Sequence, residues 1–140
     1  MKVLHSVALG FGLLFAAAAV NAQGVNLRAN IPFNFVVANQ ALPAGHYVVR
    51  QSDGAILTIQ SSDGDKSAST ITFACGGGKP WQKNELVFHR VGNSYFLSQV
   101  QIEGYSEGRE LPKNHTEAEA EVASNQKADT VTIVAEVANR

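Results

Sequence analysis

The feature that most constrains the fold is a strict alternation of apolar and polar side chains over residues 27–37. Every odd position in this segment is apolar: Leu27, Ala29, Ile31, Phe33, Phe35 and Val37. A period of two places these residues on one face of a β-strand, so we expect a strand with a single buried face. Pro32 lies on the opposite face and cannot donate to a ladder, which indicates an edge strand or a local break.

Turn signals recur at short intervals after this segment. The sequence Leu42-Pro43-Ala44-Gly45 predicts a turn, because proline presets φ at the second turn position. Two Asp-Gly pairs, Asp53-Gly54 and Asp63-Gly64, predict hairpins, since both residue types tolerate positive φ. We therefore expect strands over residues 46–52, 56–60, 67–74, 85–91 and 95–102, the last two joined by Gly92-Asn93-Ser94.

The second Asp-Gly hairpin leaves two registers open. A three-residue loop over residues 63–65 would place Leu57 opposite Ile71, whereas a two-residue loop would place Leu57 opposite Thr70. A slip of one residue moves the apolar set of a strand to its other face. We expect the three-residue loop.

The hairpin of residues 85–91 and 95–102 carries apolar side chains on both faces. We expect Leu86, Phe88 and Leu97 on one side and Val87, Phe96 and Val100 on the other. A sheet buried on both faces needs cover on both faces.

The candidate cover is the one expected helix, over residues 113–124. Asn114 suits its N-cap, and Glu117 stands three residues later, as in a capping box. Its apolar stripe consists of alanines and Val122, so we expect weak packing. Residues 129–137 predict a final alternating strand, with one side made of Val131, Ile133, Ala135 and Val137.

Short strands separated by Gly, Pro, Asn and Asp turns predict an all-β fold. We expect a single domain of about seven to eight strands with one short helix in its C-terminal half. An antiparallel sandwich and a partly closed barrel both fit this pattern.

Residues 1–22 have the pattern of a secretory signal peptide. Lys2 precedes an apolar run over residues 7–20, and small residues lead to Ala22. The run is shorter than the roughly 20 residues that span a bilayer, and a lipoprotein would need cysteine where Gln23 stands. We expect cleavage after Ala22, an exported domain over residues 23–140, and a periplasmic or secreted location.

Charge argues against a nucleic-acid partner. The chain holds 11 Lys and Arg against 12 Asp and Glu, and the basic residues are scattered, whereas phosphate binding needs a clustered positive field. No segment after residue 22 is apolar for long enough to form a membrane-spanning helix. We therefore do not expect an integral membrane protein after signal cleavage.

The sequence offers no catalytic, cofactor-binding or metal-binding set. His46, His89, His115 and Cys75 lack the spacing of metal ligands. Cys75 is the only cysteine, so it is either buried as a small apolar residue or paired with a partner chain.

Two further groups have ordinary explanations. The segment 76–80 departs from the spacing of a phosphate loop and is better explained as a flexible break. Glu103, Glu107 and Glu110 fall in a glycine-rich stretch that we expect to be a turn, with solvated charges.

Aromatic and cationic side chains give one possible binding surface. Core packing accounts for the phenylalanines of the second hairpin, but Trp81 and Tyr95 remain available for binding. We expect the neighbourhood of Arg90 and Tyr95 to be the functional surface, with Trp81 as a possible contributor.

Three stretches together carry a resemblance. They are residues 30–37 with 42–47, residues 86–90 with 95–100, and residues 108–113. In this order, behind a signal peptide, the chain resembles a family of small uncharacterised exported proteins of acidobacteria-type soil bacteria. The resemblance covers residues 26–124. It implies export, and because the family has no assigned activity it implies no functional residue.

These observations favour a non-enzymatic binding or structural module of the cell envelope. Its partner would be an envelope protein or a small molecule. Two alternatives remain open: a small β-barrel that holds an apolar small-molecule ligand, and an enzyme of unknown class.

Overall fold

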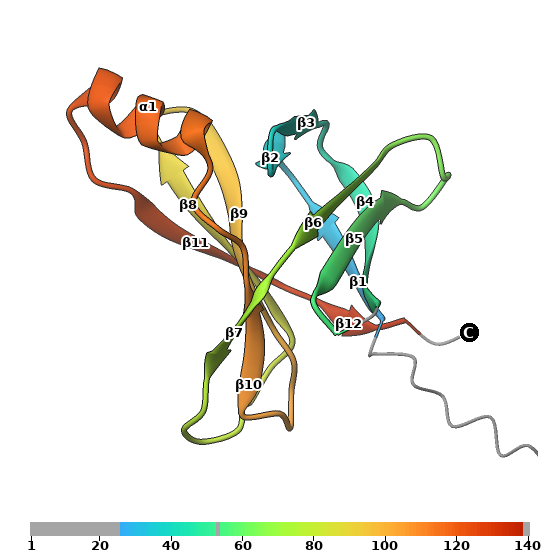
Figure 1. The fold of residues 1–140 in the computed structure, drawn as a ribbon. Coiled ribbons are helices and arrows are strands. Elements are labelled where there is room, and N and C mark those ends of the chain that lie inside the picture. Colours follow the sequence, from blue (N-terminus) through green and yellow to red (C-terminus); the bar gives the residue numbers. More distant parts are fainter. Residues whose placement is uncertain (1–25, 53, 139–140) are drawn as a thin grey trace, which may run out of the picture.

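The computed structural model describes residues 26–52 and 54–138 and shows two β-sheets and one helix (Figure 1). The expected signal segment, residues 1–22, lies outside the described residues. The five-stranded sheet has the spatial order β12 (Glu136–Val137), β1 (Leu27–Ile31), β4 (Gly45–Ser52), β5 (Ile56–Ser61) and β6 (Ser67–Ile71).

The second sheet has seven strands. Its main path is β11 (Asp129–Val134), β8 (Glu85–Val91), β9 (Ser94–Gln101), β10 (Glu107–Glu110) and β7 (Phe73–Gly76). The hairpin of β2 (Phe35–Val37) and β3 (Gln40–Leu42) joins this sheet through a parallel pairing of Val36 with Phe96. The prediction of an all-β fold is confirmed. The sheets do not close into a barrel, so of the two expected architectures the sandwich is the one that forms.

The strand count exceeds the expected seven to eight partly because three expected strands are split between the sheets. The segment 27–37 divides into β1 and β2 at residues 32–34, where Pro32 predicted a break. The segment 67–74 divides into β6 and β7, and the segment 129–137 into β11 and β12. The chain passes from one sheet to the other at each division, which Figure 1 shows most clearly for β11 and β12.

Hydrogen bonds fix the division between β6 and β7 at Thr72. The amide and hydroxyl of Thr72 both donate to the carbonyl of Ala55, at 2.8 and 2.7 Å. The guanidinium of Arg109 on β10 donates to the hydroxyl and carbonyl of Thr72, at 2.8 and 2.7 Å. Thr72 thus ends the pairing with β5 and starts the pairing with β10, which alternation alone cannot reveal.

A similar corner separates β11 from β12. Ala135 is buried, and its amide donates to the carbonyl of Asn84 at 2.8 Å. Beyond it, Val137 pairs with Leu27 and remains 51% exposed. The expectation of a single strand over residues 129–137, with Val137 on the same side as Val131 and Ile133, is therefore wrong.

The register at the second Asp-Gly hairpin also differs from expectation. Leu57 pairs with Thr70 and Ile59 with Ala68, so the preferred three-residue loop is wrong. The carboxylate of Asp63 accepts hydrogen bonds from the Ser61 hydroxyl (2.6 Å) and the Asp65 amide (2.9 Å), which stabilise a longer turn over residues 62–65. Ala68, opposite Ile59, is buried in the core, whereas Ile71 is 61% exposed.

A register shift in the β8–β9 hairpin corrects the expected faces. Phe88 pairs with Leu97 but Val87 pairs with Gln99, so Ser98 is an extra residue in β9. Because of this bulge, Val100 pairs with Leu86 and joins the core. The expectation that Val100 shares a face with Val87 and Phe96 is wrong.

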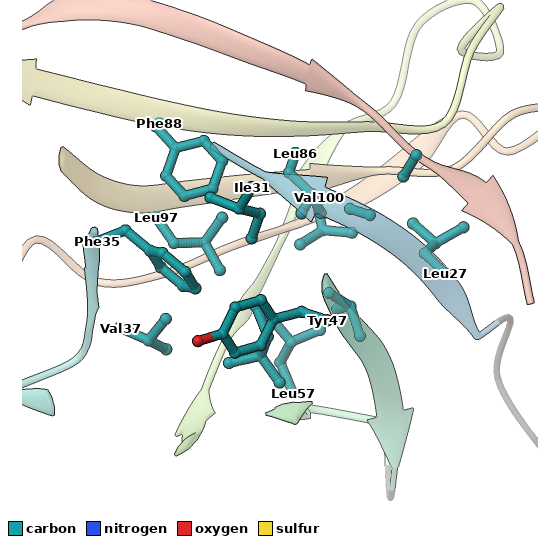
Figure 2. Packing of buried hydrophobic residues seen from close by; sticks show 14 of the residues in the cluster. Leu27, Ile31, Phe35, Val37, Tyr47, Leu57, Leu86, Phe88, Leu97 and Val100 are labelled. Carbon is teal, nitrogen blue, oxygen red and sulfur yellow. The ribbon is translucent and has the colours of Figure 1, made fainter. Parts of the chain in front are cut away.

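The core fills the space between the two sheets. Figure 2 shows Tyr47 and Leu57 of the five-stranded sheet packed below Phe35, Leu97 and Phe88. The ring of Phe35 contacts those of Tyr47 and Phe88 edge-to-face, with centroids 5.0 and 5.6 Å apart. Each of these five side chains is at most 4% exposed, so the domain has an apolar core that does not depend on a disulfide.

The helix α1 (His115–Ser124) lies against β8, on the sheet face opposite the core (Figure 1). The Asn114 side chain accepts from the Glu117 amide at 2.7 Å, which confirms the expected N-cap. Val122 is 82% exposed, in agreement with the expected weak packing.

Candidate functional site

Arg90, Tyr95 and Phe33 form a small surface cluster, the aromatic platform, at the turn end of β8 and β9. The rings of Tyr95 and Phe33 stack with centroids 3.8 Å apart and planes inclined by 14°. The Arg90 guanidinium carbon lies 5.7 Å from the Tyr95 ring centroid, within the range of a cation–π contact. The structure therefore brings together Arg90 and Tyr95, the two residues of the expected functional neighbourhood, and adds Phe33, which sequence reasoning assigned to the core.

Local structure sets each member of the platform. Gly92 adopts φ of 62°, which allows the tight turn that pairs Arg90 with Tyr95 across the hairpin. Pro32 directly follows β1. The next residue, Phe33, lies in the connection from β1 to β2, and its ring contacts that of Phe88 edge-to-face, with centroids 5.0 Å apart. One side of the stacked pair is thus anchored to the core, and the proline was the only sequence signal that could have revealed Phe33.

The Arg90 guanidinium lies at the protein surface. Its Nε donates to the carbonyl of Gly92 at 3.0 Å, and the side chain is exposed. Asp129 of β11 pairs with Arg90 in the sheet, but no ion pair joins the two side chains. The guanidinium therefore retains donors for an anionic group, next to an apolar aromatic face.

Trp81 does not belong to this surface. It forms a parallel bridge with Glu103, eight positions beyond Tyr95, so along the strand the two aromatic residues are separated by roughly 25 Å. Its indole lies against Gly76 and Gly108, near the Cys75 sulfur. Among the described residues, its Nε1 is a buried donor without a partner. The structure therefore does not bring Trp81 together with Arg90 and Tyr95, with which it was expected to share a surface.

Cys75 is half-buried on β7, as a free thiol beside this indole. Burial raises the pKa of the Cys75 thiol. A hydrogen bond from the side-chain Nε2 of Gln99, 3.1 Å from the sulfur, offsets part of this increase. The position fits the expectation of a packed small residue, and pairing with another chain stays a prediction.

The raised pKa predicts slow alkylation of Cys75. A higher pKa leaves less thiolate at a given pH, and the thiolate is the species that reacts. At pH 8 we expect the folded protein to react with iodoacetamide at least about fivefold more slowly than the protein in urea, with the rate rising at higher pH. Because Cys75 is the only cysteine, total labelling reports this site alone. Equal rates in both states would contradict the prediction.

A histidine–carboxylate pair holds the helix against the sheet, which sequence reasoning missed. Glu117 is 4% exposed, and its Oε1 lies 2.6 Å from Nδ1 of His89 on β8. The side-chain Nδ2 of Asn114 also donates to the carbonyl of Ala38, which connects the start of the helix to the loop after β2. No group of three potential metal-ligating side chains occurs in the described part of the chain.

The acidic stretch of residues 103–110 is more ordered than expected. Glu107 and Glu110 lie on β10, which pairs with both β7 and β9, so the expectation of a turn throughout is wrong. Glu103 pairs with Trp81, and its amide donates to the Asn84 side chain at 2.8 Å. All three glutamate side chains are exposed, in agreement with solvated charges.

A surface pocket of about 310 Å³ lies beside the Asp63 turn and is lined in part by Tyr47, His46 and Lys66. The Tyr47 hydroxyl donates to the Pro43 carbonyl at 2.5 Å. Burial, followed by the nearby Asp63 carboxylate, raises the pKa of Tyr47, while hydrogen bonds from Ser61 and Asp65 lower the pKa of Asp63. The Tyr47 hydroxyl and the Asp63 carboxylate are thus occupied by hydrogen bonds to neighbouring residues.

No helix in residues 26–52 and 54–138 has the length and apolar character required to cross a bilayer. In comparisons with known proteins, no family model, no curated protein and no solved structure matches this chain.

Proposed function

We propose that this chain is an exported, non-enzymatic binding module of the cell envelope, and that its contact surface is the aromatic platform. The observation that carries the proposal is the stacking of Tyr95 on Phe33 beneath the exposed Arg90 guanidinium. Tyrosine and arginine are enriched among the residues that dominate binding energy at protein interfaces.

Rigidity supports this proposal. Phe33 rests on the buried ring of Phe88, and Arg90 is held by its bond to the Gly92 carbonyl. A side chain that is already ordered loses less conformational entropy on binding. The partner that fits is an envelope protein that presents an apolar side chain beside a carboxylate, because the platform offers an aromatic face next to guanidinium donors.

The alternatives have less support. An apolar ligand inside the domain would need space that side chains such as Phe35, Tyr47 and Phe88 fill. An enzyme would need positioned acid–base groups, and the only buried carboxylate among the described residues, Glu117, helps to attach the helix.

The test is native mass spectrometry of the tagged protein purified from its own periplasm. We expect a bound protein with the unaltered chain, and a loss of affinity of about tenfold or more for Arg90→Ala and Tyr95→Ala. Arg50→Ala is the matched control, since Arg50 is an exposed arginine on β4 of the other sheet. Tyr95→Phe should retain binding, because the ring and its stacking remain.

Two results would contradict the proposal. If Arg90→Ala and Tyr95→Ala retained every partner, the platform would not be the contact surface. If the purified protein carried a small apolar molecule and no protein, the ligand-binding alternative would replace the interaction module.

A further inference from the structure

The outer face of β8 and β9 carries a second, smaller set of buried apolar side chains. Phe96 pairs with His89 across the two strands, so both side chains lie on the sheet face that α1 covers (Figure 1). Phe96 is 2% exposed and Val91 is 3% exposed, yet neither belongs to the core between the sheets. These two side chains lie beneath α1 and its flanking connections, residues 112–128, which we call the cover.

The cover presents a polar side to these apolar side chains. Glu117 is the only buried residue of α1, and Asn114, just before the helix, is half-buried. Val122 is the only large apolar residue of the helix, and it is 82% exposed. A helix that belongs permanently to a core directs its apolar stripe inward. The helix α1 has the opposite orientation, so apolar contacts contribute little to its attachment.

Two polar contacts attach the cover to the rest of the domain. Oε1 of Glu117 lies 2.6 Å from Nδ1 of His89, and Nδ2 of Asn114 donates to the loop after β2. In contrast, the ion pair of Lys113 with Glu121 joins two residues of the cover and adds nothing to its attachment. A single hydrogen bond makes a modest net contribution, so an attachment of this kind is reversible.

Both ends of the cover are fixed to the seven-stranded sheet. Leu111 is buried, and its amide donates to the carbonyl of Ser98 at 2.8 Å. At the other end, Asn125 ends the helix with φ of 52°, and Asp129 begins the pairing with β8. The segment between these points can therefore move while every strand keeps its partners.

We infer that the cover is a lid, which detaches from β8 while both sheets stay folded and thereby exposes Phe96 and Val91. The contact between Glu117 and His89 holds the closed state. Local opening of this kind occurs in segments with few buried apolar contacts. The inference is independent of the proposed binding function, because it uses no residue of the aromatic platform.

A thiol placed beneath the cover measures how often the lid opens. Val91→Cys in a Cys75→Ser background gives the full chain a single thiol, and its rate of reaction with iodoacetamide reports exposure of that position. Val49→Cys in the same background is the matched reference, because Val49 is 2% exposed in the core between the sheets. We expect Val91→Cys to react at least about tenfold faster than Val49→Cys.

The contact that closes the lid is tested on this labelling rate. Glu117→Ala should raise the rate for Val91→Cys at least about tenfold and leave that for Val49→Cys unchanged. His89→Ala should have a similar effect, and the double variant should add little to either. Glu119→Ala is the matched control, because Glu119 pairs with another residue of the cover and is exposed, and its rate should equal that of the parent.

Amide hydrogen exchange of the unaltered chain gives a readout that needs no introduced cysteine. The helix amides, including that of Ala118, which donates to the Asn114 carbonyl, should exchange at least about tenfold faster than the amides of β4 and β5. Glu117→Ala should accelerate exchange in the helix and leave β4 and β5 unchanged.

Two results would overturn the inference. If the thiols at positions 91 and 49 reacted at equal rates, and the helix amides exchanged no faster than those of β4 and β5, the cover would leave only when the whole domain unfolds. If Glu119→Ala raised the labelling rate as much as Glu117→Ala, the contact of Glu117 with His89 would not hold the closed state.

Discussion

Phe88→Ala should lower the free energy of unfolding by about 3–5 kcal/mol, the range for removing a large aromatic ring from a packed core. Phe88 is fully buried and lies between the rings of Phe33 and Phe35, at centroid distances of 5.0 and 5.6 Å. Its loss removes the contacts with both rings and leaves a cavity in the core. Urea unfolding monitored by circular dichroism measures this change.

The same substitution should also disturb the aromatic platform, because Phe33 rests on Phe88. We expect a change in tyrosine near-ultraviolet circular dichroism even where the protein remains folded. Val122→Ala is the control, since Val122 is 82% exposed, and its effect should stay within about 0.5 kcal/mol. A loss below about 1 kcal/mol for Phe88→Ala would mean that the ring is not packed as described.

Hairpins could be predicted from the sequence because their signals are local. The range expected for residues 85–91 is that of β8, and the turn at Gly92 brings Arg90 opposite Tyr95. Two of the three members of the aromatic platform, Arg90 and Tyr95, therefore follow from a turn signal and two strand patterns. Neither observation requires knowledge of the rest of the fold.

The divisions between sheets could not be predicted from the same kind of signal. Alternation continues through Thr72 and through Ala135, because a strand keeps its two faces when it changes partners. What changes at Thr72 is the identity of the hydrogen-bond partner, from Ala55 to a neighbour on β10, and that is a long-range fact. Proline at position 32 was the one corner with a local signal.

The position of Trp81, away from the candidate site, could not be predicted for a related reason. Trp81 and Tyr95 are both aromatic and exposed in expectation, but their separation depends on where the long β9 strand carries the chain. The bulge at Ser98 similarly moved Val100 to the core, because one extra residue reverses every later side chain. Composition and spacing do not encode either feature.

Gly108→Ala should destabilise the protein by about 2–3 kcal/mol, a large effect for the addition of one methyl group. A Cβ at Gly108 would lie 2.6 Å from the carbonyl oxygen of Val100, which is backbone of the neighbouring strand β9. It would also lie 3.4 Å from the Cys75 sulfur and 3.5 Å from the Trp81 Nε1. The clash is with backbone, so β9 and β10 must separate for alanine to fit.

This separation has a measurable signature besides stability. Trp81 covers Gly108, so its fluorescence should shift to longer wavelength, and Cys75 should react faster with iodoacetamide as its burial decreases. Gly78→Ala is the matched control: a Cβ there has no neighbour within 4 Å, and the change should stay within about 0.5 kcal/mol. If both variants were equally stable, Gly108 would not mark a close approach between strands, and the packing of Trp81 and Cys75 over β10 would have to be revised. If only Gly108→Ala lost stability while the fluorescence of Trp81 stayed constant, the strain would lie in the backbone alone and the indole would pack independently of it.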